Sequence, residues 1–123
     1  MADMVYICSP YRADNLDDLS RNIIYAQELT RKALLKGLYP VTPHLYMTQC
    51  LRDHDAAERA AGCKAGLGIL RRCSAVVVGT RYGISEGMKA EIAAARKLYM
   101  PVIYLDREQE QPKTKEENKE SEE

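Results

Sequence analysis

The chain has 123 residues with 18 acidic and 18 basic side chains, and it lacks Phe and Trp, so eight Tyr supply all of its aromatic surface. This length suits one domain with a single sheet covered by helices on both faces. No run approaches the roughly 20 apolar residues of a membrane span, and the N-terminus does not begin a signal peptide. We therefore expect a cytoplasmic protein that binds no membrane.

The first 42 residues predict a strand, a long helix and a second strand. Met4–Cys8 is a short apolar run, which we interpret as a buried strand. Asn15 can cap a helix together with Asp18, and Gly37 marks the point where that helix stops. Its apolar period is carried by Leu16, Leu19, Ile23, Ala26, Thr30 and Ala33. Residues 38–41 form the second predicted strand.

The middle of the chain predicts an irregular connection and an Ala-rich helix. Residues 43–52 form an irregular loop or a short helix. The helix begins at Asp53 or Asp55 and runs to about Arg72. Each glycine inside it costs about 1 kcal/mol relative to alanine, so close packing is expected at those positions. These glycines are Gly62, Gly66 and Gly68.

The last elements complete an alternating pattern. Ala75–Gly79 predicts a third strand, 86–98 a third helix and 101–105 a fourth strand. Alternating strands and helices with short connections indicate a parallel sheet with right-handed crossovers. We expect an α/β, flavodoxin-like (Rossmann-like) three-layer sandwich with about four strands in the order 2-1-3-4. Its ligand site would lie beyond the carboxyl ends of strands 1 and 3.

Glu91 is the unusual residue of the predicted third helix. It flanks the apolar stripe rather than the polar side. That stripe consists of Met88, Ile92, Ala95 and Tyr99. A carboxylate directed toward apolar groups costs free energy unless it is paired, protonated or used. Two interpretations remain open: a functional carboxylate, or an early-turn Glu that complements the helix dipole and reaches solvent.

Several cofactor and metal motifs are missing from the sequence. The segment S-P-Y-R after the first strand has no glycine for a dinucleotide pyrophosphate, and no P-loop lysine motif or G-x-S-x-G elbow occurs. The cysteines form no C-x-x-C pair and have no ligand spacing with either histidine. We therefore expect reduced thiols, no metal site and no cofactor.

Three segments carry motifs in a fixed order across most of residues 4–105. They read V-Y-I-C-S-P-Y-R from Val5, G-L-Y-P-V-T-P-H from Gly37, and L-R-R-C-S-A-V-V-V from Leu70 followed by G-M-K-A-E-I-A-A-A from Gly87. The set resembles the nucleoside 2-deoxyribosyltransferase superfamily, including its deoxynucleoside 5′-monophosphate N-glycosidases. The core S-E-G-M-K-x-E-I is similar to that of small bacterial proteins of unassigned function.

The resemblance implies a set of site residues. It makes Glu91 the nucleophile that forms a glycosyl ester, and Tyr6 the aromatic residue whose hydroxyl orients that nucleophile. An arginine and two hydroxyls near a helix N-terminus also suit a phosphate dianion. The positions that match the substrate and phosphate contacts of the monophosphate-specific members are Ser9, Arg12, Ser85 and Gly87.

One matching position lacks the side chain that the family uses. Gly66 stands where the resemblance implies an acid that protonates the departing base. Four other carboxyl groups are candidates to replace it: Asp53, Asp55, Glu58 and Glu86. We favour Asp53, or His44 as a proton donor near neutral pH.

The resemblance implies an N-glycosidase or deoxyribosyl transferase that acts on a nucleoside 5′-monophosphate or nucleoside. The alternatives are a weak or inactive nucleotide-binding or sensing protein on the same fold, and an interaction module. A homodimer or larger assembly is expected, and Leu45, Tyr46, Met47 and Leu51 either form its interface or cap the core.

Charge divides the chain into two parts. Residues 1–105 carry a formal charge of +4, and 106–123 carry −4. The positive part suits a small anionic ligand but is too weak and scattered to indicate a nucleic acid polymer. We expect 1–105 to form the deoxyribosyltransferase-like domain, and 106–123 to form a charged, disordered tail.

Overall fold

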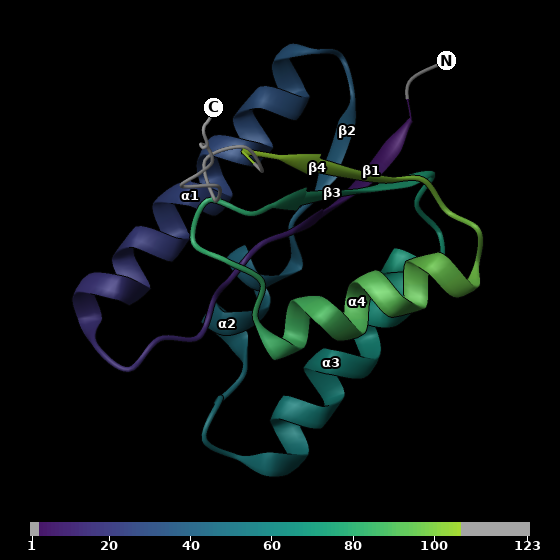
Figure 1. Ribbon diagram of the computed structural model, residues 1–123. Coiled ribbons are helices and arrows are strands. Elements are labelled where there is room, and N and C mark those ends of the chain that lie inside the picture. The colour runs from purple at the N-terminus through teal and green to yellow at the C-terminus, as the bar shows by residue number, and fades with distance from the viewer. Residues whose placement is uncertain (1–2, 107–123) are drawn as a thin grey trace, which may run out of the picture.

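The computed structural model describes residues 3–106, which form a four-stranded parallel sheet with helices on both faces (Figure 1). The strands are β1 (Met4–Cys8), β2 (Tyr39–Val41), β3 (Ala75–Gly79) and β4 (Val102–Leu105). Their spatial order is β2-β1-β3-β4, and every neighbouring pair is parallel. The predicted order 2-1-3-4 is confirmed. β1 and β3 are the two central strands, so their carboxyl ends lie side by side.

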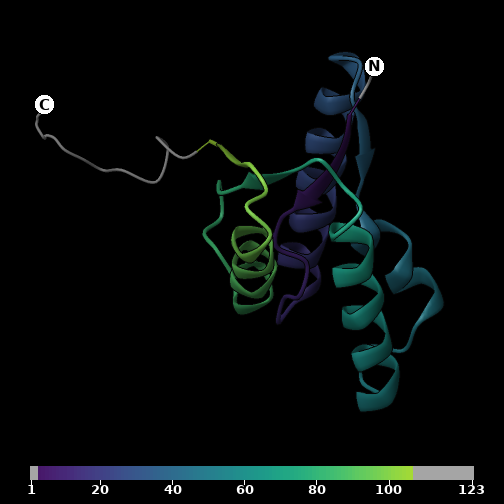
Figure 2. The same ribbon diagram turned by 90° about the vertical axis from the view of Figure 1, so that its right-hand side faces the viewer.

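Three longer helices cover the sheet. They are α1 (Leu16–Leu35), α3 (Ala56–Leu70) and α4 (Glu86–Lys97). Side chains alternate along a strand, so β1 and β3 direct residues such as Val5 and Val77 toward α1. Their neighbours in sequence, such as Tyr6 and Val76, face α3 and α4. The two helices on that face contact each other, and Figure 2 shows both of them, α4 in green and α3 in teal. This is the predicted three-layer, flavodoxin-like sandwich.

Each of these helices begins at a polar capping residue. The side chain of Asn15 accepts the backbone N–H of Asp18 at 2.8 Å. Asp55 caps α3, and Ser85 caps α4 by accepting the N–H of Met88 at 3.3 Å. Such caps satisfy backbone donors that have no partner within the helix. The predicted beginnings of α1 and α4 are confirmed, and α3 begins after the second of the two candidate aspartates.

The buried face of α1 differs from the predicted one. Leu16 is 79% exposed, and the buried residues of the helix are Asn22, Tyr25, Ala26, Leu29 and Ala33. The missing side chain of Gly79 explains why α1 is rotated about its own axis relative to the predicted orientation. A Cβ there would lie 2.5 Å from Cδ1 of Leu29 and 2.6 Å from the hydroxyl oxygen of Tyr25. The larger side chains of α1 therefore occupy the space above β3.

Tyr99 is not part of the apolar stripe of α4, contrary to the prediction. The helix ends at Lys97, and Tyr99 has a φ of 57° and is 95% exposed. Its N–H bonds to the carbonyl of Arg96, and the N–H of Met100 bonds to that of Ala95. This is a Schellman motif with tyrosine at the position that glycine usually occupies. Met100, rather than Tyr99, packs against the core.

The connection between β2 and α3 contains two short helices. A 3₁₀ turn, η1, covers Pro43–Leu45, and α2 covers Met47–Cys50. The sequence left open a loop or a short helix over 43–52, and both forms occur. Because α2 is short and contains no buried residue, no strong apolar pattern marks it in the sequence.

A polar cluster connects the ends of β3 and β4 to α1. The guanidinium of Arg81 donates to both carboxylate oxygens of Glu28, at 3.1 and 2.6 Å. The hydroxyl of Tyr25 donates to Oδ2 of Asp106 at 2.7 Å. This anchoring fixes the sheet edge on the α1 side. The predicted tail lies outside the described residues apart from Asp106, its first residue.

No helix within residues 3–106 is long and apolar enough to cross a membrane.

Candidate active site

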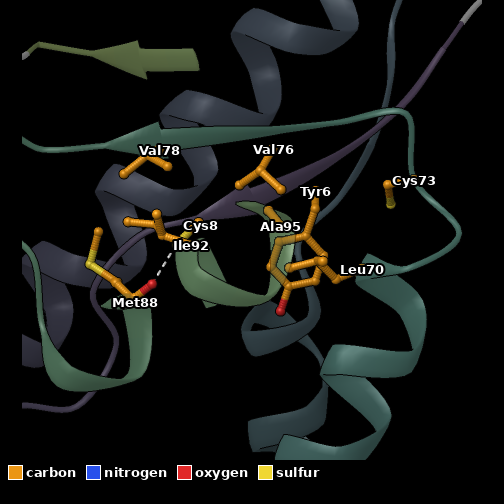
Figure 3. Packing of buried hydrophobic residues seen from close by; sticks show 9 residues of the cluster. All are labelled: Tyr6, Cys8, Leu70, Cys73, Val76, Val78, Met88, Ile92 and Ala95. Carbon is orange, nitrogen blue, oxygen red and sulfur yellow. Dashed lines mark hydrogen bonds between the residues drawn. The ribbon is translucent and has the colours of Figure 1, made fainter. Parts of the chain in front are cut away.

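Tyr6 and Glu91 form the centre of the site. Tyr6 is 2% exposed on the central strand β1, and its hydroxyl points away from the sheet, toward the helical layer (Figure 3). It donates a hydrogen bond of 2.6 Å to Oε2 of Glu91 on α4. The pair therefore joins the middle of the sheet to the second turn of the helix.

The partners of Glu91 are neutral. Burial raises its carboxyl pKa, whereas the hydrogen bond from the Tyr6 hydroxyl and the nearby Cys8 thiol act in the opposite direction. The thiol donates to the carbonyl of Met88 at 3.9 Å (Figure 3). Burial, followed by the nearby charge of Glu91, also raises the pKa of Tyr6 well above its usual range. Within residues 3–106, no Lys, Arg or His forms an ion pair with Glu91. A buried carboxylate without a cation has a high free energy when ionised, and this makes it a candidate nucleophile or base.

A pocket of about 170 Å³ opens above this pair. α3 contributes Gly62, Cys63 and Gly66 to its lining. A Cβ at position 66 would lie 3.3 Å from the hydroxyl oxygen of Tyr6, and one at position 62 would lie 2.9 Å from Cδ1 of Leu51. The close packing predicted for the glycines of this helix holds at these two positions. At Gly68 a Cβ would meet nothing within 4 Å.

The segment from η1 to the start of α3 forms the opposite wall. Pro43, Met47 and Leu51 give it an apolar surface, and His44 and Thr48 add polar groups. Met47 and Leu51 thus line this pocket, and the assignment of the segment to an interface between subunits stays a prediction.

His44 lies in the pocket as a neutral imidazole. Its Nε2 is 3.0 Å from the hydroxyl oxygen of Ser9, and its ring meets that of Tyr11 edge to face. Burial lowers the pKa of His44 to about 4. The neutral form of the ring is therefore favoured at pH 7, because the uncharged hydroxyl of Ser9 does not offset the cost of burying a charge. The role of His44 as a proton donor stays a prediction.

Arg12 and Asp53 form an ion pair beside the pocket. Nε of Arg12 is 3.3 Å from Oδ2 of Asp53, and both side chains are more than half exposed. Asp53 also lines the pocket together with Arg59, which donates to its backbone carbonyl at 3.0 Å. The pair joins the loop after β1 to the loop before α3. An exposed pair of this kind contributes little to stability, so its partners are available to a ligand.

The predicted phosphate contacts are divided between two places. Ser9 and Arg12 follow β1, and Ser85 and Gly87 begin α4, so all four lie beyond the carboxyl ends of the central strands. None of them lines the pocket. Ser9 is buried and bonded to His44, whereas Ser85 and Gly87 are exposed.

Some site residues were missed in the sequence. Cys8 lies two positions after Tyr6 on the same strand, so the alternation of side chains indicates that both face Glu91. Gly62 and Gly66, which the sequence marked for close packing, are four residues apart on one helix face, and this spacing indicates that both line the same pocket. No sequence pattern indicated Arg59 or Thr48, because their positions depend on the path of the connection between β2 and α3.

One family model matches almost all of the described residues. Its description is a domain of unknown function, DUF7768, and the match covers residues 3–105. The chain belongs to this family. A comparison of this DUF7768 chain with curated protein sequences gives no match.

Solved structures share the fold of this DUF7768 domain. A 2-deoxyribosyltransferase from Bacillus psychrosaccharolyticus aligns with a TM-score of 0.60 and 17% identity, over 82% of this chain and 70% of that one. A 2-deoxyribosyltransferase from Leishmania mexicana aligns with a TM-score of 0.59 and 15% identity, over 84% of this chain and 63% of that one. The resemblance seen in the sequence motifs is confirmed at the level of the fold.

Proposed function

We propose that this DUF7768 domain cleaves the N-glycosidic bond of a nucleoside 5′-monophosphate or nucleoside through a covalent ester on Glu91. The observation that carries the proposal is the partly buried carboxylate of Glu91, which lines a pocket and accepts a hydrogen bond from the Tyr6 hydroxyl at 2.6 Å. The alignments with 2-deoxyribosyltransferases support this chemistry through the shared fold.

Glu91 attacks the anomeric carbon of the sugar while the bond to the base breaks. A covalent intermediate divides one difficult displacement into two easier ones. Tyr6 holds one carboxylate oxygen, so the other is free to attack. Water then releases the sugar by hydrolysis, or a second base accepts it by transfer. We favour hydrolysis.

Arg12 is the proposed phosphate ligand. Its guanidinium is more than half exposed, and among residues 3–106 its ion-pair partner is Asp53 at the protein surface, so a dianion can replace that carboxylate at small cost. Ser9, Ser85 and Gly87 border the same edge of the sheet and complete the proposed phosphate region.

A nucleotide-binding protein without catalysis is the second candidate. The neutral state of His44 and the pairing of Asp53 with Arg12 favour it, because they leave neither predicted proton donor ready to act.

The test is incubation of the full chain with a panel of nucleosides and their 5′-monophosphates. Mass spectrometry then measures the free base, and acid quenching followed by peptide mapping detects a sugar ester on Glu91. Base release that is lost in Glu91→Gln and retained in Glu86→Gln, a matched change five residues earlier in α4 at a 91% exposed side chain that does not line the pocket, supports the proposal. Ligand binding without base release at any pH identifies the second candidate instead.

A further inference from the structure

The pocket holds a nucleophile but, within the described residues, no side chain placed to protonate a departing base at neutral pH. The proton of Tyr6 is already bonded to Glu91. The hydroxyl of Thr48 donates to the carbonyl of His44 at 2.8 Å, and His44 itself is neutral. Of the remaining polar groups, Asp53 is ion-paired with an arginine, the guanidinium of Arg59 does not lose its proton in proteins, and the thiol of Cys63 belongs to an exposed residue at the side of the pocket.

The helix that forms one side of the pocket adds no acid either. Gly66 is buried, and a Cβ there would point to the Tyr6 hydroxyl oxygen at 3.3 Å. Any side chain at this position would reach the space beside Glu91. The position that could best carry an acid is therefore occupied by a residue with no side chain.

Glu91, for its part, lacks a cation. Its hydrogen-bond donor is the hydroxyl of Tyr6, while the nearby thiol of Cys8 donates to the carbonyl of Met88, and residues 3–106 provide Glu91 with no ion pair. A buried carboxylate is stabilised strongly by an opposite charge within about 4–6 Å. A positively charged ligand above Glu91 would supply that charge.

We propose that the substrates are cationic N-glycosides, in which the base carries a formal positive charge conjugated with the glycosidic nitrogen, as in N7-alkylated purine or pyridinium nucleosides and their 5′-monophosphates. This inference rests on the proposed function and defines its substrate class. It explains both observations together, because a cationic base stabilises ionised Glu91 and leaves without needing an acid.

The reaction balances without a proton donor. An oxygen of Glu91 bonds to the anomeric carbon, and the bond from that carbon to the base nitrogen breaks. Its electron pair moves into the ring and cancels the positive charge, so the base leaves as a neutral molecule. A water oxygen then bonds to the same carbon, Glu91 leaves as a carboxylate, and the proton of the water goes to solvent.

The walls of the pocket fit such a base. Met47 and Leu51 offer apolar contacts to a flat ring. Gly66, where a Cβ would lie 3.3 Å from the Tyr6 hydroxyl oxygen, keeps a side chain out of the space beside Glu91.

The experiment compares 7-methylguanosine with guanosine, and the 5′-monophosphates of both, on the full chain. These pairs share a sugar and differ in the charge of the base. Each enzymatic rate is divided by the spontaneous rate of the same substrate, because cationic glycosides also hydrolyse faster unaided. General acids contribute about 10²–10⁴-fold, so the acceleration should be at least about 100-fold larger for the methylated substrates.

The pH profile gives a second readout. With a pyridinium nucleoside, whose ring has no proton to lose near neutral pH, cleavage should rise with pH as Glu91 ionises and then stay level, since no acid has to remain protonated. A bell-shaped profile would show a general acid and overturn the inference.

The possible outcomes separate the two proposals. Cleavage of the methylated substrates alone, lost in Glu91→Gln, supports both. Comparable acceleration of neutral and cationic substrates overturns the cationic class and leaves the proposed function in place. Failure to cleave either kind overturns both proposals.

A binding test that needs no turnover uses 1-methylnicotinamide and nicotinamide, a cation and its neutral counterpart. The cation should bind more tightly to the wild-type chain, and the preference should disappear in Glu91→Gln. Equal affinities of the wild-type chain for the two ligands would contradict the inference.

Discussion

The hydroxyl oxygen of Tyr6 lies 2.6 Å from Oε2 of Glu91, although 85 residues separate them in the sequence. One belongs to a central strand and the other to a helix packed on it, so neither depends on a loop for its position. Rigid elements hold reacting groups more accurately than loops do. The candidate nucleophile is therefore oriented by the core of the protein.

Glu91→Gln should abolish cleavage, because the amide has the same shape but does not attack the anomeric carbon. Its stability at pH 7 should equal or exceed that of the wild type, since burial disfavours the ionised carboxyl that the change removes. Base release and thermal unfolding measure the two effects. Retained turnover would contradict the catalytic role of Glu91, and Glu86→Gln is the control because its side chain is 91% exposed.

Tyr6→Phe should move the acidic limb of the pH–rate profile to higher pH. The Tyr6 hydrogen bond lowers the pKa of Glu91, so its loss raises that pKa, and Glu91 ionises only in more alkaline solution. The unfolding free energy above that range should fall by about 1–3 kcal/mol, because a buried acceptor loses its donor. Tyr39→Phe, a change at an exposed site on β2, is the control. An unshifted profile would show that the hydroxyl does not act on Glu91.

His44→Gln should reduce the loss of stability in acid. The folded-state pKa of His44 is about 4, below its ordinary 6.5. The contribution of neutral His44 to the free energy of unfolding is therefore fully present above pH 6.5 and is lost as the pH falls toward 4. The loss amounts to about 3 kcal/mol at full protonation. Urea unfolding from pH 7 to 4 measures it as the difference between wild type and variant. The exposed His54 supplies a matched control, His54→Gln, and equal slopes for all three proteins would contradict the burial of His44.

Gly79→Ala and Gly68→Ala should have opposite effects on stability. A Cβ at 79 would overlap Leu29 and Tyr25 at 2.5 and 2.6 Å, so unfolding should become easier by about 1–3 kcal/mol. A Cβ at position 68 would have no neighbouring atom within 4 Å, so alanine there should stabilise α3 by up to about 1 kcal/mol. Denaturant titration measures both changes. Equal effects at the two positions would refute the packing of α1 against β3.

Arg12→Ala should weaken binding of a nucleoside 5′-monophosphate and leave binding of the nucleoside unchanged. Hydrogen bonds to charged groups contribute about 1.5–3 kcal/mol, and calorimetry on Glu91→Gln protein measures the loss without turnover. Asp53→Asn removes the same ion pair but keeps the arginine, so it should not weaken the monophosphate. If the Glu91→Gln protein with Arg12 intact binds the nucleoside and its monophosphate with equal affinity, the loop after β1 does not bind the phosphate.

The fold was predictable because its signals are local. Strands such as Ala75–Gly79 are short apolar runs between turn residues, and Asn15 and Ser85 mark where helices begin. The orientation of α1 about its own axis was not predictable, because it depends on Gly79, which lies in a strand more than 40 residues away. Tyr99 was misassigned because the spacing continues the helical period, while the Schellman motif is formed by backbone hydrogen bonds.

The candidate site was predictable where it depends on periodicity. The position of Glu91 on the flank of α4 and of Tyr6 on β1 follows from helix and strand spacing together with the family motifs. The protonation of His44 depends on how deeply the connection after β2 buries it. The partner of Arg12 depends on how that connection returns past the loop after β1. Neither the protonation of His44 nor the partner of Arg12 is predictable from the spacing of residues in the sequence.

Because the chain has no Trp, its near-ultraviolet absorbance comes from tyrosine, and Tyr6 is the tyrosine that lines the pocket above Glu91. A ligand that enters this pocket changes the surroundings of that ring directly. Occupancy is therefore readable as a tyrosine difference spectrum of the unlabelled protein, and the comparison with Tyr6→Phe assigns the signal to one side chain. The Tyr6 ring, which orients the carboxylate of Glu91, therefore also reports ligand binding in the pocket through its absorbance.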